Sequence, residues 1–425
     1  MSRSETIAKA AYAFLIPSLL LAGNEKTSFA AAPAAAQQEP LPGAEYHIYK
    51  GNTHAHTMFT ASHGQQLMND KSEGATETGL PVDANGVQRP PRGKVLKPDW
   101  QKYQGTPSEH YARAKTNGYD FYVTTDHSQE ESFAPNSPTN AAWLATKQQA
   151  LDATDHRFVA LAGYEHSENN GPGGKGHLNV INTSEYINAL APGIDLPYLY
   201  RWLKTAPPNG EGEVVACFNH PGRNSYNDWD YRDPEVTEKI TLLEVVNGNS
   251  HIHYDAFVRA LDKGWKVSPV CGLDNHGYWG ISHHTSATCV LATNCTKVAI
   301  LDALRHRRTY AALATNLDCR YAVNGKIMGS TLEPTETFAF DIAIHSEGTT
   351  KDADKITKVD IVADGGTVAS THQVVPPALS LRWKPSLTAS TNKFFFVRVW
   401  KAGGGSTDSK PEIPVAWLAP VWVVR

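Results

Sequence analysis

Two histidines stand one residue apart within Gly51–Thr57, directly after a run with the residue types of a β-strand. Because alternate residues of an extended chain face the same way, His54 and His56 can present two imidazoles to one metal ion. Two ligands alone hold a metal weakly, and an isolated pair of this kind fits a structural role equally well. The chain has eighteen histidines, so their positions must decide between these roles.

Further side chains that can bind metals follow other predicted strands, at the point where each strand ends. They are Asp126 with His127, Glu165 with His166, His220, and Asp274 with His276. In parallel β/α folds the carboxyl ends of successive strands meet at one crevice, so residues far apart in the sequence become neighbours. Histidines and carboxylates at so many strand ends predict a metal site far more specifically than the first pair alone.

The elements that must position these side chains alternate between β-rich runs and helical patterns from Tyr46 to about Ala314, which predicts an α/β architecture with parallel strands. The expected strands cover residues 46–50, 121–125, 158–163, 178–181, 214–219, 241–246, 266–271 and 288–291. Two expected helices, 108–117 and 254–263, are each followed by a glycine. The stretch 64–105 has no periodicity and is expected to form a long loop over the site.

The pattern changes after Asn316. The runs 338–345, 358–363, 394–400 and 416–424 are β-like and are separated by Gly, Pro, Ser and Thr. This pattern is typical of a β-sandwich. The expected organisation is a processed segment at 1–36, the metal-binding α/β domain at 45–315 and a β-sandwich domain at 316–425.

These motifs resemble those of the PHP (polymerase and histidinol phosphatase) superfamily, which has an HxH pair, a TDH-like turn, a Glu, a later His and a closing DxH. Within that superfamily the chain is most similar to the secreted branch that includes carbaryl hydrolases. Gly176–Asn179 after the Glu, and Ala416, Trp417 and Pro420–Trp422 near the end, carry this likeness. The resemblance implies a distorted (β/α)7 barrel with up to three divalent ions at its C-terminal face.

The resemblance also implies a ligand set for each ion. The first ion would be held by His54, His56, Glu165 and Asp274. Glu165 would bridge to a second ion, which His177 and His220 complete, and His127 and His276 would hold a third. The family has Asp or His five or six residues beyond the HxH pair, whereas here His63 lies seven residues beyond His56. His63 is either the third ligand of that ion or an exposed loop histidine.

Divalent ions held close together lower the pKa of a shared water into the neutral range and neutralise the oxygens of a phosphoryl or carbonyl group. Mixed imidazole and carboxylate ligation suits zinc, manganese or iron. We therefore expect two or three divalent ions, a metal-bound hydroxide as nucleophile, and Glu165, Asp274 and His276 in the catalytic machinery. Arg223 is a further catalytic candidate, since it could pair with a substrate phosphate or form an ordinary surface salt bridge.

Several other residues near these motifs are open to two interpretations. Asp126 is expected to orient a ligand histidine instead of binding an ion itself. Six more could line the pocket or could simply belong to loops and helix starts: Asn247, Asn249, His251, His253, His283 and His284. The five cysteines match neither a disulfide scaffold nor a CxxC metal knuckle, and we assign them no function.

Residues 1–36 have the order of an export signal: Arg3 and Lys9 precede the apolar run 10–22, and small residues follow it. The apolar run is too short to span a bilayer comfortably, and Pro17 interrupts it, so we expect no membrane span. The mature protein is therefore expected in the periplasm or outside the cell. A net charge of −4 gives no electrostatic basis for a stable nucleic-acid partner.

The leading hypothesis from these observations is hydrolysis of a small-molecule phosphomonoester or phosphodiester. The alternative keeps the same site and changes the substrate to a carboxyl or carbamate ester. A second alternative is an inactive, structural metal-binding protein, but all the principal ligand types are present, which argues against loss of activity. The sequence leaves the oligomeric state open.

Overall fold

The computed structural model describes residues 39–62, 64–68, 95–168, 176–248, 251–282, 285–348, 352–388, 391–404 and 413–424. The expected export segment lies outside these residues, as does most of the long loop expected at 64–105. Four of the candidate site residues also lie outside them: His63, Asn249, His283 and His284.

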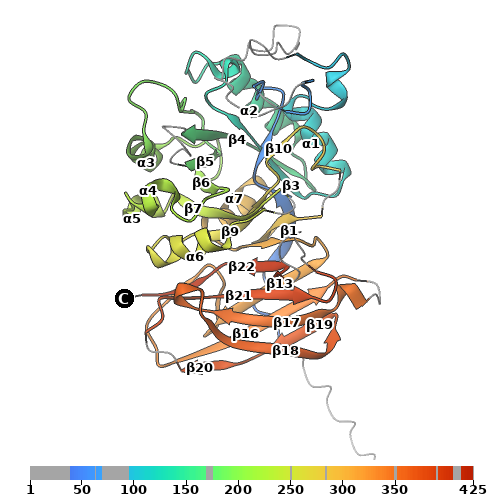
Figure 1. The fold of residues 1–425 in the computed structure, drawn as a ribbon, viewed down its shortest axis with the longest axis vertical. Coiled ribbons are helices and arrows are strands. Elements are labelled where there is room, and N and C mark those ends of the chain that lie inside the picture. Colours follow the sequence, from blue (N-terminus) through green and yellow to red (C-terminus); the bar gives the residue numbers. More distant parts are fainter. Residues whose placement is uncertain are drawn as a thin grey trace, which may run out of the picture. The chain divides into compact units, whose positions relative to one another are not determined.

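A curled sheet of mixed direction runs through the first part of the chain (Figure 1). In spatial order its strands are β12 (Thr309–Ala312), β11 (Ala287–Ala292), β1 (His47–Asn52), β3 (Phe121–His127), β4 (Val159–Glu168), β5 (Gly176–Ile181), β6 (Val215–Asn219) and β7 (Ile240–Asn247). Both β8 (His251–Ile252) and β9 (Ser268–Gly272) pair with β7. The predicted α/β class is confirmed in this coarse form, and every strand expected before residue 292 overlaps an observed strand.

The strand directions differ from the expected parallel pattern at β11, which is antiparallel to β1, and at β5. Strands β1, β3 and β4 run parallel, as do β6, β7 and β9, whereas β5 is antiparallel to both β4 and β6. Only residues 169–175 join β4 to β5. A parallel return needs a crossover of a dozen or more residues, so this short connection can only bring the chain back antiparallel.

The sheet curls until β9, which pairs with β7, approaches β11. The Cys271 N–H donates to Thr288 Oγ1 at 2.8 Å, and the Thr288 hydroxyl lies 2.8 Å from the Cys271 carbonyl. The Thr288 side chain therefore makes the hydrogen bonds that backbone groups would make if β9 and β11 formed a continuous ladder. The curl turns the carboxyl ends of the strands toward a common centre.

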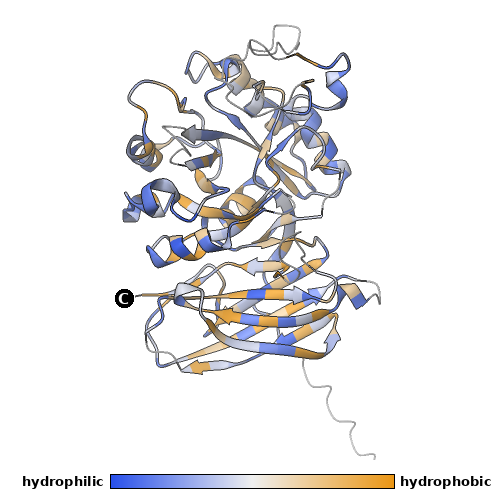
Figure 2. Ribbon diagram, viewed as in Figure 1, coloured by the Kyte–Doolittle hydropathy of each residue, from blue (hydrophilic) through white to orange (hydrophobic). Residues whose placement is uncertain are grey.

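Polar caps and one apolar face define the helices around this sheet. Thr106 and Glu109 form a capping box at the start of α1 (Pro107–Thr116), which overlaps the helix expected at 108–117. The other helices are α2 (Ala141–Ala153), α3 (Leu196–Thr205), α4 (Ser225–Trp229), α5 (Pro234–Thr237), α6 (Tyr254–Asp262) and α7 (Lys297–Arg305). Short 3-10 turns lie at η1 (Trp100–Lys102), η2 (Glu131–Phe133), η3 (Asp352–Asp354) and η4 (Asp364–Gly366). Figure 2 shows hydrophobic and hydrophilic residues on the same helices, and each helix contributes apolar side chains to the buried core, although Leu144 and Leu151 of α2 are exposed.

The last part of the chain continues the same sheet and adds a second one. Its strands are β13 (Leu317–Val323), β14 (Lys326–Ile327), β15 (Thr331–Leu332), β16 (Thr337–Ser346), β17 (Ile356–Val362), β18 (Val368–Ala378), β19 (Ser380–Trp383), β20 (Ser386–Thr388), β21 (Phe394–Lys401), β22 (Ala416–Leu418) and β23 (Val421–Val423). Strand β22 pairs with β12, opposite Tyr310 and Ala312, so the first sheet extends through β21 to β17 and β18. Strands β13, β14, β16, β19 and β20 form a separate sheet, and a buried apolar core lies between the two.

This shared sheet predicts that residues 316–425 cannot be removed without loss of the fold. Leu291 and Tyr310 are buried in the core that these residues complete. Burial of each such side chain contributes about 1.5–3 kcal/mol, and a whole domain is stable by only about 5–15 kcal/mol. We expect a chain ending at Thr315 to be insoluble or to lack a cooperative thermal transition. A soluble, monomeric truncated chain with the melting temperature of the full chain would contradict this expectation.

All five cysteines are free thiols, and four of them are buried. Among the described residues, no helix has the length and apolar character that crossing a bilayer requires.

Candidate metal centre

All the predicted metal ligands that the structure describes lie in one cluster. They form four overlapping groups, in each of which the donor atoms lie within 4.8 Å of one another: His56, His127 and His276; His54, His56 and Glu165; His54, His220 and Asp274; and Glu165, His177 and His220. His63 is outside the described residues, so its predicted role stays a prediction.

Strand register explains how these distant residues meet. His127 at the end of β3 lies opposite Glu165 in β4, and His177 at the start of β5 lies opposite Ser167. The short strand β2 (Ala55–His56) pairs in parallel with β10 (Asn275–His276), which sets His56 beside His276. The ends of neighbouring strands therefore deliver their side chains to one place, as strand-end sites in α/β folds do.

Glu165 occupies the centre of the cluster, and its two oxygens face different partners. Oε1 accepts a hydrogen bond from Asn219 Nδ2 at 2.9 Å and lies 3.1 Å from His177 Nδ1 and 3.3 Å from His220 Nε2. Oε2 accepts no hydrogen bond but lies 3.1 Å from His127 Nδ1 and 3.5 Å from the Nε2 atoms of both His54 and His56. A carboxylate surrounded in this way by imidazole nitrogens has the arrangement that a ligand bridging two cations requires.

Asp274 closes the cluster from the opposite side. Its Oδ1 lies 3.0 Å from His56 Nε2 and 3.4 Å from His54 Nε2, and its Oδ2 lies 3.9 Å from His220 Nε2. The residue has a left-handed backbone with φ of 50°, a conformation that aspartate tolerates better than most residues. The turn between β9 and β10 thus places a second carboxylate against the same histidines.

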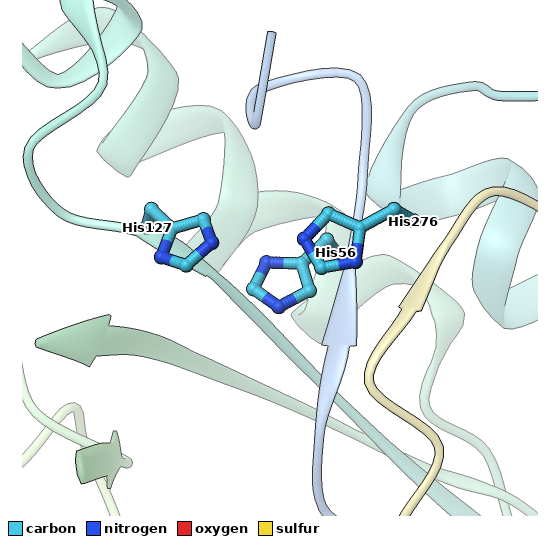
Figure 3. Close-up of side chains that lie close together, drawn as sticks. All are labelled: His56, His127 and His276. Atoms are coloured by element: carbon cyan, nitrogen blue, oxygen red, sulfur yellow. The ribbon is translucent and has the colours of Figure 1, made fainter. Parts of the chain in front are cut away.

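Figure 3 shows the third group, in which the rings of His56, His127 and His276 lie side by side. The centroid of the His56 ring is 3.9 Å from that of the His276 ring and 4.5 Å from that of the His127 ring. The resemblance implied only His127 and His276 for the third ion, together with His63. In the structure His56 belongs both to this group and to the group formed with His54 and Glu165.

Burial opposes charge throughout the cluster, yet its carboxylates and imidazoles hold one another in the charged form. Burial lowers the pKa of His54, but the charges of Asp274 and Glu244 raise it well above its usual value. Burial raises the pKa of Glu165, but the surrounding histidines, His54 first, bring it well below its usual range. Burial also lowers the pKa of His220, and its hydrogen bond to Glu165 raises it to about 9. Divalent cations compete with protons for these same atoms, so the donor set fits metal ions.

Two solved structures resemble this chain at low identity. One is a two-domain protein from Bacteroides vulgatus containing a predicted PHP-like metal-dependent phosphoesterase, with 17% identity, a TM-score of 0.44, and coverage of 91% of this chain and 99% of that one. The other is described as a metal-dependent phosphoesterase from Bifidobacterium adolescentis, with 12% identity, a TM-score of 0.25, and coverage of 41% and 84% respectively. No family model and no curated protein matches the chain. With both TM-scores below 0.5, the function must be argued from the side chains of this chain.

Asp126 lies behind a histidine of the cluster, His56, as the sequence predicted. It accepts hydrogen bonds from the N–H and hydroxyl of Thr57 at 2.6 and 2.7 Å, and from those of Thr60 at 3.1 and 2.8 Å. The Thr60 hydroxyl lies 3.2 Å from His56 Nδ1. Asp126 therefore holds the turn after the HxH pair and, through Thr60, the orientation of the His56 ring.

Glu244, which is fully buried in β7, was not among the residues predicted for the site. Its Oε1 lies 2.7 Å from His54 Nδ1, and its Oε2 accepts hydrogen bonds from the His220 N–H at 2.7 Å and from Asn247 Nδ2 at 3.1 Å. A Cβ at position 272 would collide with its carboxylate, so only glycine fits there. Because Glu244 accepts the Nδ1 proton of His54, loss of the second ring proton to a metal ion would leave the Nε2 lone pair facing the cluster, which is the tautomer that metal binding needs. The sequence feature that could have indicated this role is a single carboxylate within the mostly apolar strand β7.

We predict that Glu244→Gln weakens metal binding without unfolding the protein. Glutamine keeps the shape but loses the charge that favours the His54 tautomer, and changes of this kind cost about 10–100-fold in metal affinity or activity. The measurement is the affinity for Zn²⁺ in competition with a chromophoric chelator, with the melting temperature as the folding control. Unchanged affinity for every bound ion would show that Glu244 has no such role.

The remaining candidates lie around this cluster. Asn247 Nδ2 also donates to Asp274 Oδ2 at 3.2 Å, so Asn247 does line the site. Arg223 is exposed, and the ion pairs of the described residues do not include it, while its carbonyl accepts a hydrogen bond from Trp229 Nε1 at 2.7 Å. His251 is exposed at the start of β8, and His253 precedes α6 as its N-cap residue without a side-chain capping bond.

Proposed function

We propose that this chain is a PHP-type hydrolase that uses several divalent metal ions to cleave small-molecule phosphoesters, either monoesters or diesters. The observation that carries the proposal is the environment of Glu165, whose two oxygens face two different histidine groups within one buried cluster. A structural metal site needs only one closed set of four ligands. Overlapping groups that share a carboxylate and a histidine are instead the arrangement of a multinuclear hydrolytic site.

Each ion would be held by ligands taken from one or more of the overlapping groups of donor atoms. His54, His56, Glu165 and Asp274 would hold one ion; Glu165, His177 and His220 a second; and His127 and His276, with His56 nearby, a third. When bound, such ions lower the pKa of water into the neutral range and neutralise phosphoryl oxygens. Zinc, manganese and iron all suit this mixed ligand set.

The exposed fractions of the side chains support substrate access from the side of Asp274, His177 and His220. The side chain of Glu165 is 1% exposed, whereas those of Asp274, His177 and His220 are 22%, 22% and 28% exposed. Asp274 is therefore the carboxylate best placed to orient an attacking water, and Asn247 holds its Oδ2 in position. Arg223 follows His220 in the connection between β6 and α4 and is free of ion pairs within the described part of the chain, so it can bind phosphate oxygens.

An activity screen tests the proposal. The purified protein is reconstituted with Zn²⁺, Mn²⁺ or Fe²⁺ and assayed against a phosphomonoester, a phosphodiester, a carboxyl ester and a carbamate ester, each with and without a chelator. We expect chelator-sensitive turnover of a phosphoester. Turnover of the carboxyl or carbamate ester alone would instead support the alternative substrate class, and metal binding without any turnover would support a structural role.

We further propose that residues 45–315 form a distorted (β/α)7 barrel and residues 316–425 a β-sandwich domain. We also propose that residues 1–36 direct export to the periplasm or the exterior before they are removed. The order of charged, apolar and small residues at the amino terminus supports the last statement. Amino-terminal sequencing of protein from the native host tests it, since soluble cytoplasmic protein that retains Met1 or Ser2 would refute export.

A further inference from the structure

A left-handed turn without glycine follows the ligand His220. Four consecutive residues of α4, Tyr226, Asn227, Asp228 and Trp229, have φ values of 54°, 54°, 55° and 64°. L-residues rarely adopt this conformation even singly, because Cβ comes too close to the following carbonyl oxygen. Strain of this kind persists only where the surrounding structure over-determines it, and it is concentrated at functional sites.

Hydrogen bonds and ring contacts hold the turn in this conformation. The Asp228 carboxylate accepts hydrogen bonds from Arg259 at 2.8 Å and from Lys263 at 2.7 Å, both on α6 or directly after it. Trp229 is buried, and its backbone carbonyl accepts a hydrogen bond from Trp265 Nε1 at 2.9 Å. The rings of Tyr226 and Trp229 pack against each other, with centroids 5.1 Å apart. These contacts can offset the strain of the turn.

The side chain of Tyr226 extends from the turn to backbone carbonyls at or next to two predicted metal ligands, His177 and His220. The Tyr226 hydroxyl lies 2.5 Å from the backbone carbonyl of His177 and 3.1 Å from that of Asn219. His177 and Asn219 are opposite each other at the end of the β5–β6 ladder, and Asn219 directly precedes His220. A single hydroxyl therefore joins the two strand ends that carry His177 and His220.

Gly176 makes room for this contact. Its φ is +132°, and a Cβ at this position would collide with the Tyr226 ring. In the sequence, the glycine before His177 is only part of a resemblance and has no evident physical reason. The structure supplies one, because a larger residue would displace Tyr226 from the ladder end.

We propose that the left-handed turn is a positioning device for the ion that His177 and His220 bind with Glu165, and that Tyr226 is its positioning residue. The turn holds the Tyr226 hydroxyl across the end of β5 and β6, which fixes the separation of the two histidines. This inference rests on the proposed metal centre, but it does not depend on which ester is cleaved.

Tyr226→Phe tests the proposal, with Tyr321→Phe as a matched control. The buried Tyr321 hydroxyl also lies near two carbonyls, those of Phe395 at 3.1 Å and Ala419 at 2.7 Å, in a part of the chain that carries no predicted ligand. The affinity of each variant for Zn²⁺ is measured by competition with a chromophoric chelator, and the melting temperature by circular dichroism. We expect both variants to lose similar stability. Only Tyr226→Phe should bind one ion about 10–100-fold more weakly, with the other ions unaffected.

His177→Gln identifies the affected ion, because it removes a ligand from that ion alone. If Tyr226→Phe does not fold, Gly176→Ala tests the same contact by displacing the tyrosine ring. A folded variant of either kind that binds every ion as tightly as the control would overturn the proposal. If the wild-type chain binds its ions but hydrolyses no ester, the proposed function fails while the affinity comparison still decides this inference.

Discussion

Glu165→Gln is expected to reduce hydrolysis by several orders of magnitude and to lower the metal content of the folded protein. Glutamine preserves the size of the side chain but removes the charge that faces two histidine groups at once. The ions would then lose their shared ligand and the negative charge that separates them. Losses of this size are typical of groups that act as a unit in catalysis. Steady-state kinetics and elemental analysis of the same preparation provide the measurement.

Asp360→Asn is a suitable control for this substitution. Asp360 is also a buried carboxylate, and it pairs with Arg398 at 3.1 Å in the C-terminal strands. Its replacement should lower the melting temperature and leave the metal content and turnover of the protein unchanged. If Glu165→Gln kept near-wild-type activity and full metal content, Glu165 could not be a bridging ligand, and Glu168 would be the next candidate.

His56→Gln is expected to remove more metal than His177→Gln. His56 belongs to two of the groups of donor atoms, one with Glu165 and one with His127 and His276, whereas His177 belongs to a single group. Loss of a shared ligand should weaken two ions, and loss of an unshared ligand should weaken one. Turnover should fall by several orders of magnitude in His56→Gln, because the two ions act together.

Elemental analysis after dialysis against metal-free buffer compares the two variants. We expect His177→Gln to retain more ions per chain than His56→Gln, with similar melting temperatures for the metal-free forms. Equal metal content in the two variants would mean that His56 serves only one ion, and the assignment of shared ligands would have to be revised.

Much of the site could be predicted because its ligands stand at strand ends, where local sequence patterns are easiest to interpret. An apolar run followed by His127, Glu165 or His220 indicates both the strand and the end of the strand at which the polar side chain lies. The convergence of these ends follows from the geometry of α/β sheets and needs no knowledge of long-range contacts.

The features that escaped prediction depend on contacts between distant segments. Glu244 lies in the middle of a buried strand, and only the fold brings it beneath His54. The pairing of β12 with β22 joins residues far apart in the sequence, which no local pattern encodes. The left-handed turn at Tyr226 contains no glycine, so local preference argues against the conformation that tertiary contacts impose.

The number of divalent ions bound per chain tests the central claim most directly. The protein is purified under mild conditions, reconstituted separately with Zn²⁺, Mn²⁺ and Fe²⁺, freed of excess metal and analysed for metal and protein together. Since each ion normally needs three or four protein ligands and neighbouring ions can share them, the overlapping groups around Glu165 predict at least two ions per chain. A stoichiometry that never exceeds one ion with any of these metals would contradict a multinuclear centre.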